Sequence, residues 1–93
     1  MKPKIIIFST ATCRACKPYI ASVKDAIAKA DLTNEVDVLV ADPASDTEFG
    51  SEVASVPMTL IKQGKRIIAS FAGVTPAFKI IDEIERLLDE DED

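Results

Sequence analysis

Cys13 and Cys16 are the only cysteines of this 93-residue sequence, and Arg14 and Ala15 separate them. A pair at this spacing can alternate between two thiols and a disulfide when it lies at the N-terminus of a helix that follows a strand. The thiolate is the attacking form, and the unpaired N–H groups of a first helical turn stabilise negative sulfur. The pattern predicts dithiol–disulfide exchange in which Cys13 attacks and Cys16 resolves the mixed disulfide.

Positive charge lies beside the pair, because Arg14 falls inside it and Lys17 follows it directly. A cation near a thiol favours the thiolate, so both residues are candidates for tuning the pKa of Cys13 below its free value of about 8.5. The alternative for both is a plain solvent-facing side chain, since exposed charges act weakly through water. Pro18 falls just inside the expected helix, where it can kink the first turn.

Metal binding is a rival reading of the two thiols. The sequence contains no histidine, so Cys16 does not open a c-type haem signature, and a zinc site would need two thiolates from each of two chains. A metal-bridged dimer or an iron–sulfur carrier stays open as one alternative. A redox-inert binding module is the other, and metal analysis with a thiol count before and after mild oxidation separates the three.

The residues around the pair predict a strand, a helix and a second strand. Residues 4–8 are a short β-branched run, which is typical of a strand covered on both faces. Apolar residues at helical spacing then predict a helix from near Cys13 to residues 31–34. Residues 36–40 predict a second strand, parallel to the first because a helix connects them. The cysteine pair therefore follows a central strand.

The second half of the sequence predicts a short helix, a hairpin and a final helix. Ser45 and Glu48 fit the capping box of a helix that extends to about Ala54. Gly64 marks the turn of an antiparallel hairpin, and Pro76 opens the last helix. The strand-like runs of that hairpin are residues 58–62 and 66–71, and the last helix continues to Leu88.

The order β-α-β-α-β-β-α predicts one α/β domain with a four-stranded mixed sheet and helices on both faces. We expect this domain over residues 1–88 and an acidic tail over residues 89–93. Tyr19, one turn beyond the pair, either lines a substrate groove or packs inside. The phenylalanines expected in the core are Phe8, Phe49, Phe71 and Phe78.

The formal charge of −5 resides in the tail, because residues 1–88 contain 11 basic and 11 acidic residues. Without a basic stripe to neutralise phosphates, nucleic-acid binding is excluded. The tail itself is expected to be a solvated, frayed terminus. The apolar run at residues 5–8 is too short for a secretory signal or for a membrane span of about 20 residues. We therefore expect a cytoplasmic protein without membrane contact. In that reducing compartment, a cysteine pair is expected to be catalytic or metal-binding.

Three segments together resemble the thioredoxin family: Cys13-Arg14-Ala15-Cys16-Lys17, Ser55-Val56-Pro57-Met58-Thr59, and Gly73 before the last helix. The resemblance spans nearly the whole chain. The extra N-terminal strand and helix of full-length thioredoxins have no counterpart in this sequence. The resemblance implies the minimal thioredoxin fold that glutaredoxins also use. It also implies a cis bond between Val56 and Pro57 beside the cysteines, where the backbone of Val56 pairs with an extended substrate. An ordinary proline at the start of an edge strand is the alternative.

The sequence departs from the family around the pair. Thr12 precedes Cys13, and Arg14-Ala15 lies between the two cysteines, whereas the usual thioredoxin centre is Trp-Cys-Gly-Pro-Cys. Ile7 falls near the position where many thioredoxins carry a buried carboxylate. The glutaredoxin centre Cys-Pro-Tyr-Cys is absent, and residues 71–75 replace the Gly-Gly and acidic residues with which glutaredoxins bind glutathione. These differences disfavour glutathione without removing it.

The resemblance implies a monomeric reductase of protein disulfides that needs no bound cofactor. Its electron donor would be a thioredoxin reductase, with glutathione as the alternative. Its acceptors would be disulfide-containing proteins such as a ribonucleotide reductase or a peroxidase. The residues expected to contact substrate beside the catalytic Cys13 and Cys16 are Thr12, Arg14, Ala15, Val56, Pro57 and Gly73.

Overall fold

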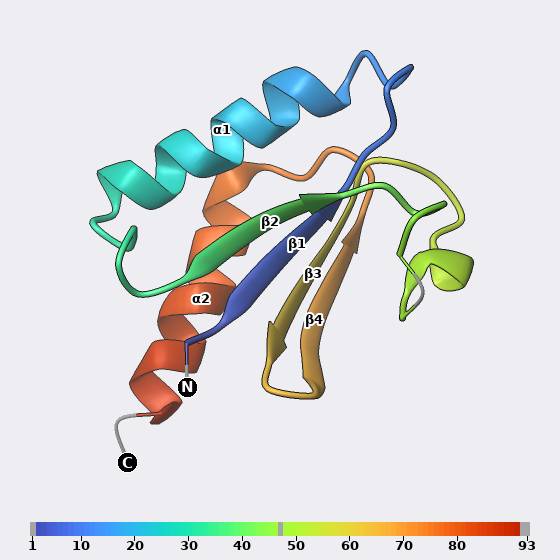
Figure 1. Cartoon of the computed structure of the whole chain (residues 1–93). Helices are drawn as coiled ribbons and strands as arrows, with labels where there is room; N and C mark the ends of the chain where they lie inside the picture. Colours follow the sequence, from blue (N-terminus) through green and yellow to red (C-terminus); the bar gives the residue numbers. More distant parts are fainter. Residues whose placement is uncertain (1, 47, 92–93) are drawn as a thin grey trace.

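Strands and helices follow one another in the predicted order, with one exception in the middle of the chain (Figure 1). The computed structural model describes residues 2–46 and 48–91. Its elements are β1 (Lys4–Phe8), α1 (Cys16–Lys29), β2 (Asp37–Ala41), the 3₁₀ helix η1 (Gly50–Glu52), β3 (Met58–Gln63), β4 (Arg66–Ala72) and α2 (Ala77–Asp91).

The four strands form one mixed sheet in the order β2-β1-β3-β4. β1 pairs in parallel with β2 and antiparallel with β3, and β4 pairs antiparallel with β3. The apolar residues of β1, from Ile5 to Phe8, are all buried, as expected for a strand that lies between two layers. The predicted α/β fold with a four-stranded mixed sheet is confirmed.

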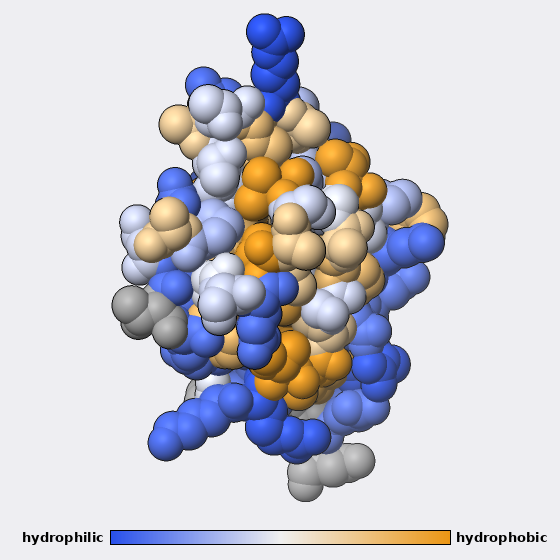
Figure 2. All heavy atoms as spheres, turned by 90° about the vertical axis from the view of Figure 1, so that its right-hand side faces the viewer, coloured by the Kyte–Doolittle hydropathy of each residue, from blue (hydrophilic) through white to orange (hydrophobic). Residues whose placement is uncertain are grey.

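The two α-helices pack on the same face of the sheet (Figure 1). The expectation of helices on both faces is therefore wrong, because the segment predicted as the second helix does not form an α-helix. Ile5 and Ile7 of β1 share one buried cluster with residues of α1 and α2, including Val23 and Ile80. The opposite face, which carries Ile6, Phe8 and Leu60, is covered by Phe49, Val53 and Val56 from the chain between β2 and β3. The side of the molecule with η1 and β4 keeps an apolar band between hydrophilic margins (Figure 2).

The helix expected from Ser45 to about Ala54 is wrong, because among the described residues of this segment only those of η1 are helical. The side chain of Asp46 accepts hydrogen bonds from the backbone N–H groups of Glu48 and Phe49, and such local bonds compete with a helix. Gly50 packs against Pro43 so closely that a Cβ would overlap its carbonyl oxygen. Short polar side chains and a close backbone approach therefore replace the second helix by turns.

α1 ends at Lys29, before the predicted residues 31–34, through a C-terminal Schellman motif. The N–H of Leu32 donates to the carbonyl of Ile27, and the N–H of Asp31 donates to that of Ala28. Asp31 occupies the left-handed region with φ of 60°. A left-handed residue closes the helix here, and glycine adopts that conformation at lower cost than aspartate.

Replacing the exposed Asp31 by glycine should stabilise the protein by up to about 1 kcal/mol, because the left-handed conformation then carries no Cβ penalty. Urea unfolding of the oxidised protein measures the change in free energy. Asp31→Ala is the matched control, since it removes the carboxylate but keeps the Cβ. An equal gain from alanine would show that the charge, and not the backbone, sets the cost.

α2 extends through Asp91, so the predicted boundary between residues 88 and 89 lies within a helix. Residues 92 and 93 of the expected tail lie outside the described residues. Arg86 pairs with Glu83 and Glu90 on this helix. The hydrogen bond to Glu83, with the charges of Glu83 and Glu90, raises the pKa of the Arg86 guanidinium above its ordinary value. No described helix is long and apolar enough to cross a membrane.

Phe78 corrects the expected core, because its side chain is 63% exposed on α2. The buried residues of this helix are Ile80, Ile84 and Leu87, which recur at helical spacing. Residues two positions apart do not share a helix face, so Phe78 points away from the stripe that begins at Ile80. Phe8 is fully buried, and Phe49 and Phe71 pack against the two clusters as partly buried residues.

Candidate active site

The cysteine pair lies at one end of the sheet, where several connecting segments meet. Phe8, the last residue of β1, pairs with Met58, the first residue of β3, and Met58 pairs with Ala72 at the end of β4. The segment that follows β1, the segment that precedes β3 and the segment that follows β4 therefore lie at the same end of the sheet. The predicted site residues come from these three segments: Thr12 to Lys17, Val56 with Pro57, and Gly73.

The helix begins at Cys16, and not near Cys13 as the sequence predicts. Pro18 explains the shift, because it has no N–H to donate to the carbonyl of Arg14. The N–H of Tyr19 instead makes the bond that opens the helix, to the carbonyl of Ala15. Cys13 lies in the turn before the helix, where its N–H donates to the carbonyl of Thr10.

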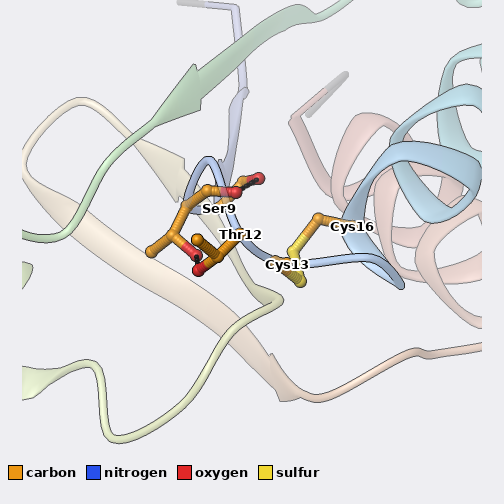
Figure 3. The surroundings of a disulfide bond; sticks show 5 residues. Ser9, Thr12, Cys13 and Cys16 are labelled. Carbon is orange, nitrogen blue, oxygen red and sulfur yellow. Dashed lines mark hydrogen bonds between the residues drawn. A yellow bond between two sulfur atoms is a disulfide. The ribbon is translucent and has the colours of Figure 1, made fainter.

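A disulfide joins the two cysteines, with 5.4 Å between their Cα atoms, at the junction of this turn and α1 (Figure 3). The two residues differ in exposure. Cys16 is fully buried, whereas Cys13 is only partly buried. A reagent or a substrate sulfur therefore reaches Cys13 first, and Cys16 is shielded by the protein.

No side chain of the N-cap or of the first turn neutralises the partial positive charge at the start of α1. Ala15, at the N-cap, provides no side-chain hydrogen bond to the free N–H groups, and the first turn contains no acidic residue. The partial positive charge of this helix end is therefore available to a sulfur anion. Arg14 and Lys17 are both exposed at this end.

The remaining predicted contact residues occupy two positions. The Val56–Pro57 peptide bond is cis, as the resemblance implies, and Pro57 is buried. The N–H of Gly73 donates to the carbonyl of Pro57 over 2.9 Å, and Gly73 has φ of 74°, which favours glycine. This bond ties the segment after β4 to the segment before β3. Thr12 is exposed in the turn before the pair (Figure 3).

A groove, which the sequence analysis considered for Tyr19 alone, runs beside the disulfide. Pro18, Tyr19 and Ser22 of α1 line one wall, residues 74–77 line the other, and Ala15 lies at the end next to the cysteines. Its volume is about 500 Å³. Val74, at its rim, is 62% exposed, so the groove offers an apolar surface to a bound chain. The sequence signal for this groove is the helical spacing of Ala15, Pro18 or Tyr19, and Ser22, which places these residues on one side of a helix.

Tyr19 packs inside the domain and still reaches the floor of this groove. Its side chain is 3% exposed, and its hydroxyl forms a hydrogen bond of 2.7 Å with Oγ1 of Thr59. Thr59 is fully buried in β3 and lies across from Ile7 in the sheet. The hydroxyls satisfy one another in an otherwise apolar core between α1 and β3.

Tyr19→Phe or Thr59→Val alone should destabilise the protein by about 1–3 kcal/mol, because each leaves the partner hydroxyl buried without its hydrogen bond. The double variant should cost clearly less than the sum of the two, since neither hydroxyl then remains. Urea unfolding of all four proteins measures this coupling. Additive losses would show that the two hydroxyls contribute independently.

The described residues do not contain three or more His, Cys, Asp or Glu side chains arranged to hold a metal ion. The groups present around the cysteine pair, namely a helix end, two exposed cations and an apolar groove, fit sulfur exchange.

Comparisons with known proteins support the fold. No protein-family model and no curated protein match the sequence. Among solved structures, the germline-specific thioredoxin Deadhead of Drosophila melanogaster is 26% identical with a TM-score of 0.76, covering 92% of this chain and 81% of its own. Thioredoxin 1 of Thermosipho africanus is 24% identical with a TM-score of 0.76, covering 97% and 99%.

Mitochondrial thioredoxin 3 of Saccharomyces cerevisiae, in its oxidised form, is a more distant likeness. It is 17% identical with a TM-score of 0.73, covering 91% of this chain and 78% of its own. These structures share the arrangement of sheet and helices that positions Cys13 and Cys16. The chain has the fold of these thioredoxins, and its Cys13-x-x-Cys16 pair on that fold supports a thiol–disulfide oxidoreductase.

Proposed function

We propose that this protein reduces disulfide bonds in other proteins, with Cys13 as the nucleophile and Cys16 as the resolving thiol. The observation that carries the proposal is the unequal exposure of the two sulfur-bearing residues at an uncapped helix end. The partly buried Cys13 can meet a substrate sulfur, and the fully buried Cys16 can meet only Cys13. This difference supports the proposal that Cys13 attacks and Cys16 resolves.

The reaction proceeds in two exchanges. The Cys13 thiolate attacks one sulfur of the substrate disulfide, a mixed disulfide forms, and the other substrate sulfur leaves as a thiolate that takes a proton from water. Cys16, once deprotonated, attacks the Cys13 sulfur, and the second substrate sulfur leaves in the same way. The substrate gains two electrons and two protons, and the protein is left with the Cys13–Cys16 disulfide seen in the structure.

The proposed substrate site combines the groove with the segment around the cis proline. An extended chain can pair with the backbone of Val56, next to Pro57, as an added strand does. An apolar side chain of the same substrate can enter the groove between α1 and residues 74–77. Thr12, Arg14, Ala15 and Gly73 lie in the segments that meet there, and we assign them to substrate contact.

The proposed electron donor is a flavin-dependent thioredoxin reductase, and the proposed acceptors are disulfide-containing proteins of the cytoplasm, such as a ribonucleotide reductase or a peroxidase. Glutathione is the alternative donor. Residues 71–75 lack the Gly-Gly and acidic residues with which glutaredoxins hold glutathione, and this difference favours the reductase. The acceptor is set by which proteins fit the groove and the Val56 backbone.

Insulin reduction with two separate donors tests the proposal. One assay contains thioredoxin reductase and NADPH, and the other contains glutathione, glutathione reductase and NADPH. We expect faster NADPH consumption in the first assay, and none above background with a variant that has serine at both cysteine positions. Faster turnover with glutathione would show that glutathione, and not thioredoxin reductase, is the donor. No turnover in either assay would overturn the proposed reduction of protein disulfides.

A further inference from the structure

The first turn of α1, which carries Cys16, has little support of its own. Ala15 at the N-cap provides no side-chain hydrogen bond. Pro18 has no N–H to donate to the carbonyl of Arg14. The bond that opens the helix, from the N–H of Tyr19 to the carbonyl of Ala15, is 3.3 Å long, whereas such bonds are most often about 2.9–3.0 Å long. Contacts outside the turn must therefore hold Cys16 in place.

The disulfide is one such contact, but the proposed reaction opens it. In the oxidised protein this bond joins Cys16 to Cys13 (Figure 3). In the mixed disulfide of the proposed reaction, Cys13 is bonded to the substrate instead, and Cys16 is a free thiol. The second exchange requires that the Cys16 sulfur still lies within reach of the Cys13 sulfur. A second contact must then keep the first turn of α1 on the sheet.

The buried hydrogen bond between Tyr19 and Thr59 is such a contact, since it joins α1 to β3 over 2.7 Å. Among residues 2–46 and 48–91, it is the only side-chain hydrogen bond between α1 and a strand. Tyr19 follows Cys16 by three positions, and residues at this spacing lie on the same face of a helix. Both residues are buried in that face. The position of Tyr19 therefore sets the position of Cys16.

Thr59 is a well-fixed partner for this bond. It lies in β3, which pairs with β1 on one side and with β4 on the other. It is the only Ser, Thr, Asn, Gln or charged residue of the described chain that is buried. A hydrogen bond in an apolar interior is electrostatically stronger than one in water. Thr59 also follows Pro57 by two positions, so the bond lies near the sheet end that carries the cysteines.

We propose that Tyr19 is a positioning residue for the second exchange, an assignment that rests on the reaction proposed above. Its hydrogen bond with Thr59 holds Cys16 in place while the disulfide is open. The Cys16 thiolate then forms a bond with the Cys13 sulfur, and the bond between Cys13 and the substrate sulfur breaks. The electron pair of that bond leaves with the substrate sulfur, which takes a proton from water. The hydroxyls of Tyr19 and Thr59 neither gain nor lose a proton.

The effect of losing this bond should fall on the second exchange. The first exchange brings two molecules together at Cys13, which lies before the helix. The second takes place within one molecule, so its rate depends on how often the two sulfurs meet in attack geometry. A misplacement of about 1 Å can slow such a step by up to about 100-fold. We expect the loss of one hydrogen bond at the edge of the turn to slow it about ten-fold.

The probe is dithiobis(nitrobenzoate), a small disulfide that releases a coloured thiol in each exchange. The reduced full-length protein is mixed with an equimolar amount in a stopped-flow instrument. Attack by Cys13 releases the first nitrothiobenzoate at a rate that depends on concentration. Displacement by Cys16 releases the second at a rate that does not. The ratio of the second rate to the first, at a fixed concentration, isolates the second exchange.

Matched variants assign the effect to the hydrogen bond. Thr59→Val should lower this ratio about ten-fold, and Tyr19→Phe should lower it equally. The double variant should lower it no further, because both substitutions break the same bond. Ile84→Val in α2 is the control, since it weakens the same buried cluster without removing a hydrogen bond, and its ratio should match that of the original protein. Circular dichroism checks that each variant is folded.

Amide hydrogen exchange tests the same contact without a reaction at the cysteines. The amide of Tyr19 reports on the first turn, because it bonds the carbonyl of Ala15. In the reduced state, this amide should exchange faster in Thr59→Val than in the original protein. The difference should be smaller in the oxidised state, where the disulfide still joins the turn to Cys13.

Three results would overturn the role of Tyr19. The first is an unchanged ratio in Thr59→Val, and the second is an equal decrease in Ile84→Val, which would assign the effect to lost stability. The third is equal exchange of the Tyr19 amide in the two reduced proteins.

Insulin reduction decides the proposed function separately. Normal release of both coloured thiols without insulin reduction would overturn the reduction of protein disulfides and leave the role of Tyr19 intact. Release of a single thiol by the original protein would overturn both, because the second exchange would then not occur.

Discussion

Cys13→Ser should reduce the rate of insulin reduction to the uncatalysed background, whereas Cys16→Ser should accumulate a mixed disulfide through Cys13. The first substitution removes the sulfur that meets the substrate. The second leaves that sulfur in place but removes the buried thiol that releases it. The expected loss is the largest for any single substitution in the chain, since the reaction has no second route through the protein.

Mass spectrometry of each variant after incubation with a small protein disulfide measures the mixed disulfide. Alkylation of the reduced original protein gives an independent check, because Cys13 should react faster than the buried Cys16. A mixed disulfide that forms equally on both variants, or equal alkylation of the two thiols, would contradict the assignment of roles.

The strands and the hairpin were predictable because their residues act locally. β-branched runs and the Gly64 turn need no distant contact to favour a hairpin, and β1, β3 and β4 form within one residue of their expected bounds. The helix expected after Ser45 failed because the Asp46 side chain and the Gly50 contact with Pro43 outweigh a capping pattern. Spacing alone does not show such competition.

The site was predictable in part. Cys13, Cys16, Pro57 and Gly73 have residue types with few alternative uses at these positions, and the structure gives a disulfide, a cis bond and a positive φ there. The hydrogen bond between Tyr19 and Thr59 joins residues 40 positions apart. Which buried hydroxyls meet depends on how α1 lies on β3, and one sequence does not determine that.

Arg14→Gly should make the reduction potential of the cysteine pair more negative, by up to about 30 mV, which corresponds to roughly 1.4 kcal/mol for two electrons. Cationic charge beside the Cys13 thiolate stabilises the reduced form relative to the disulfide. The first turn of α1 contains no acidic residue, and buried Ile7 supplies no carboxylate beneath the site. Nothing among these neighbours opposes the charge of Arg14.

The original protein should accordingly have a potential less negative than the roughly −270 mV of thioredoxin but well short of the roughly −120 mV of DsbA. Equilibration against glutathione buffers of known ratio, followed by thiol trapping, measures it. Arg14→Lys is the matched control, because it keeps the positive charge and should keep most of the shift. Because Arg14 is exposed, added salt should shrink the difference between the original protein and Arg14→Gly. A potential at or below that of thioredoxin, or one unchanged by Arg14→Gly, would refute tuning by charge and leave the exchange between Cys13 and Cys16 unaffected.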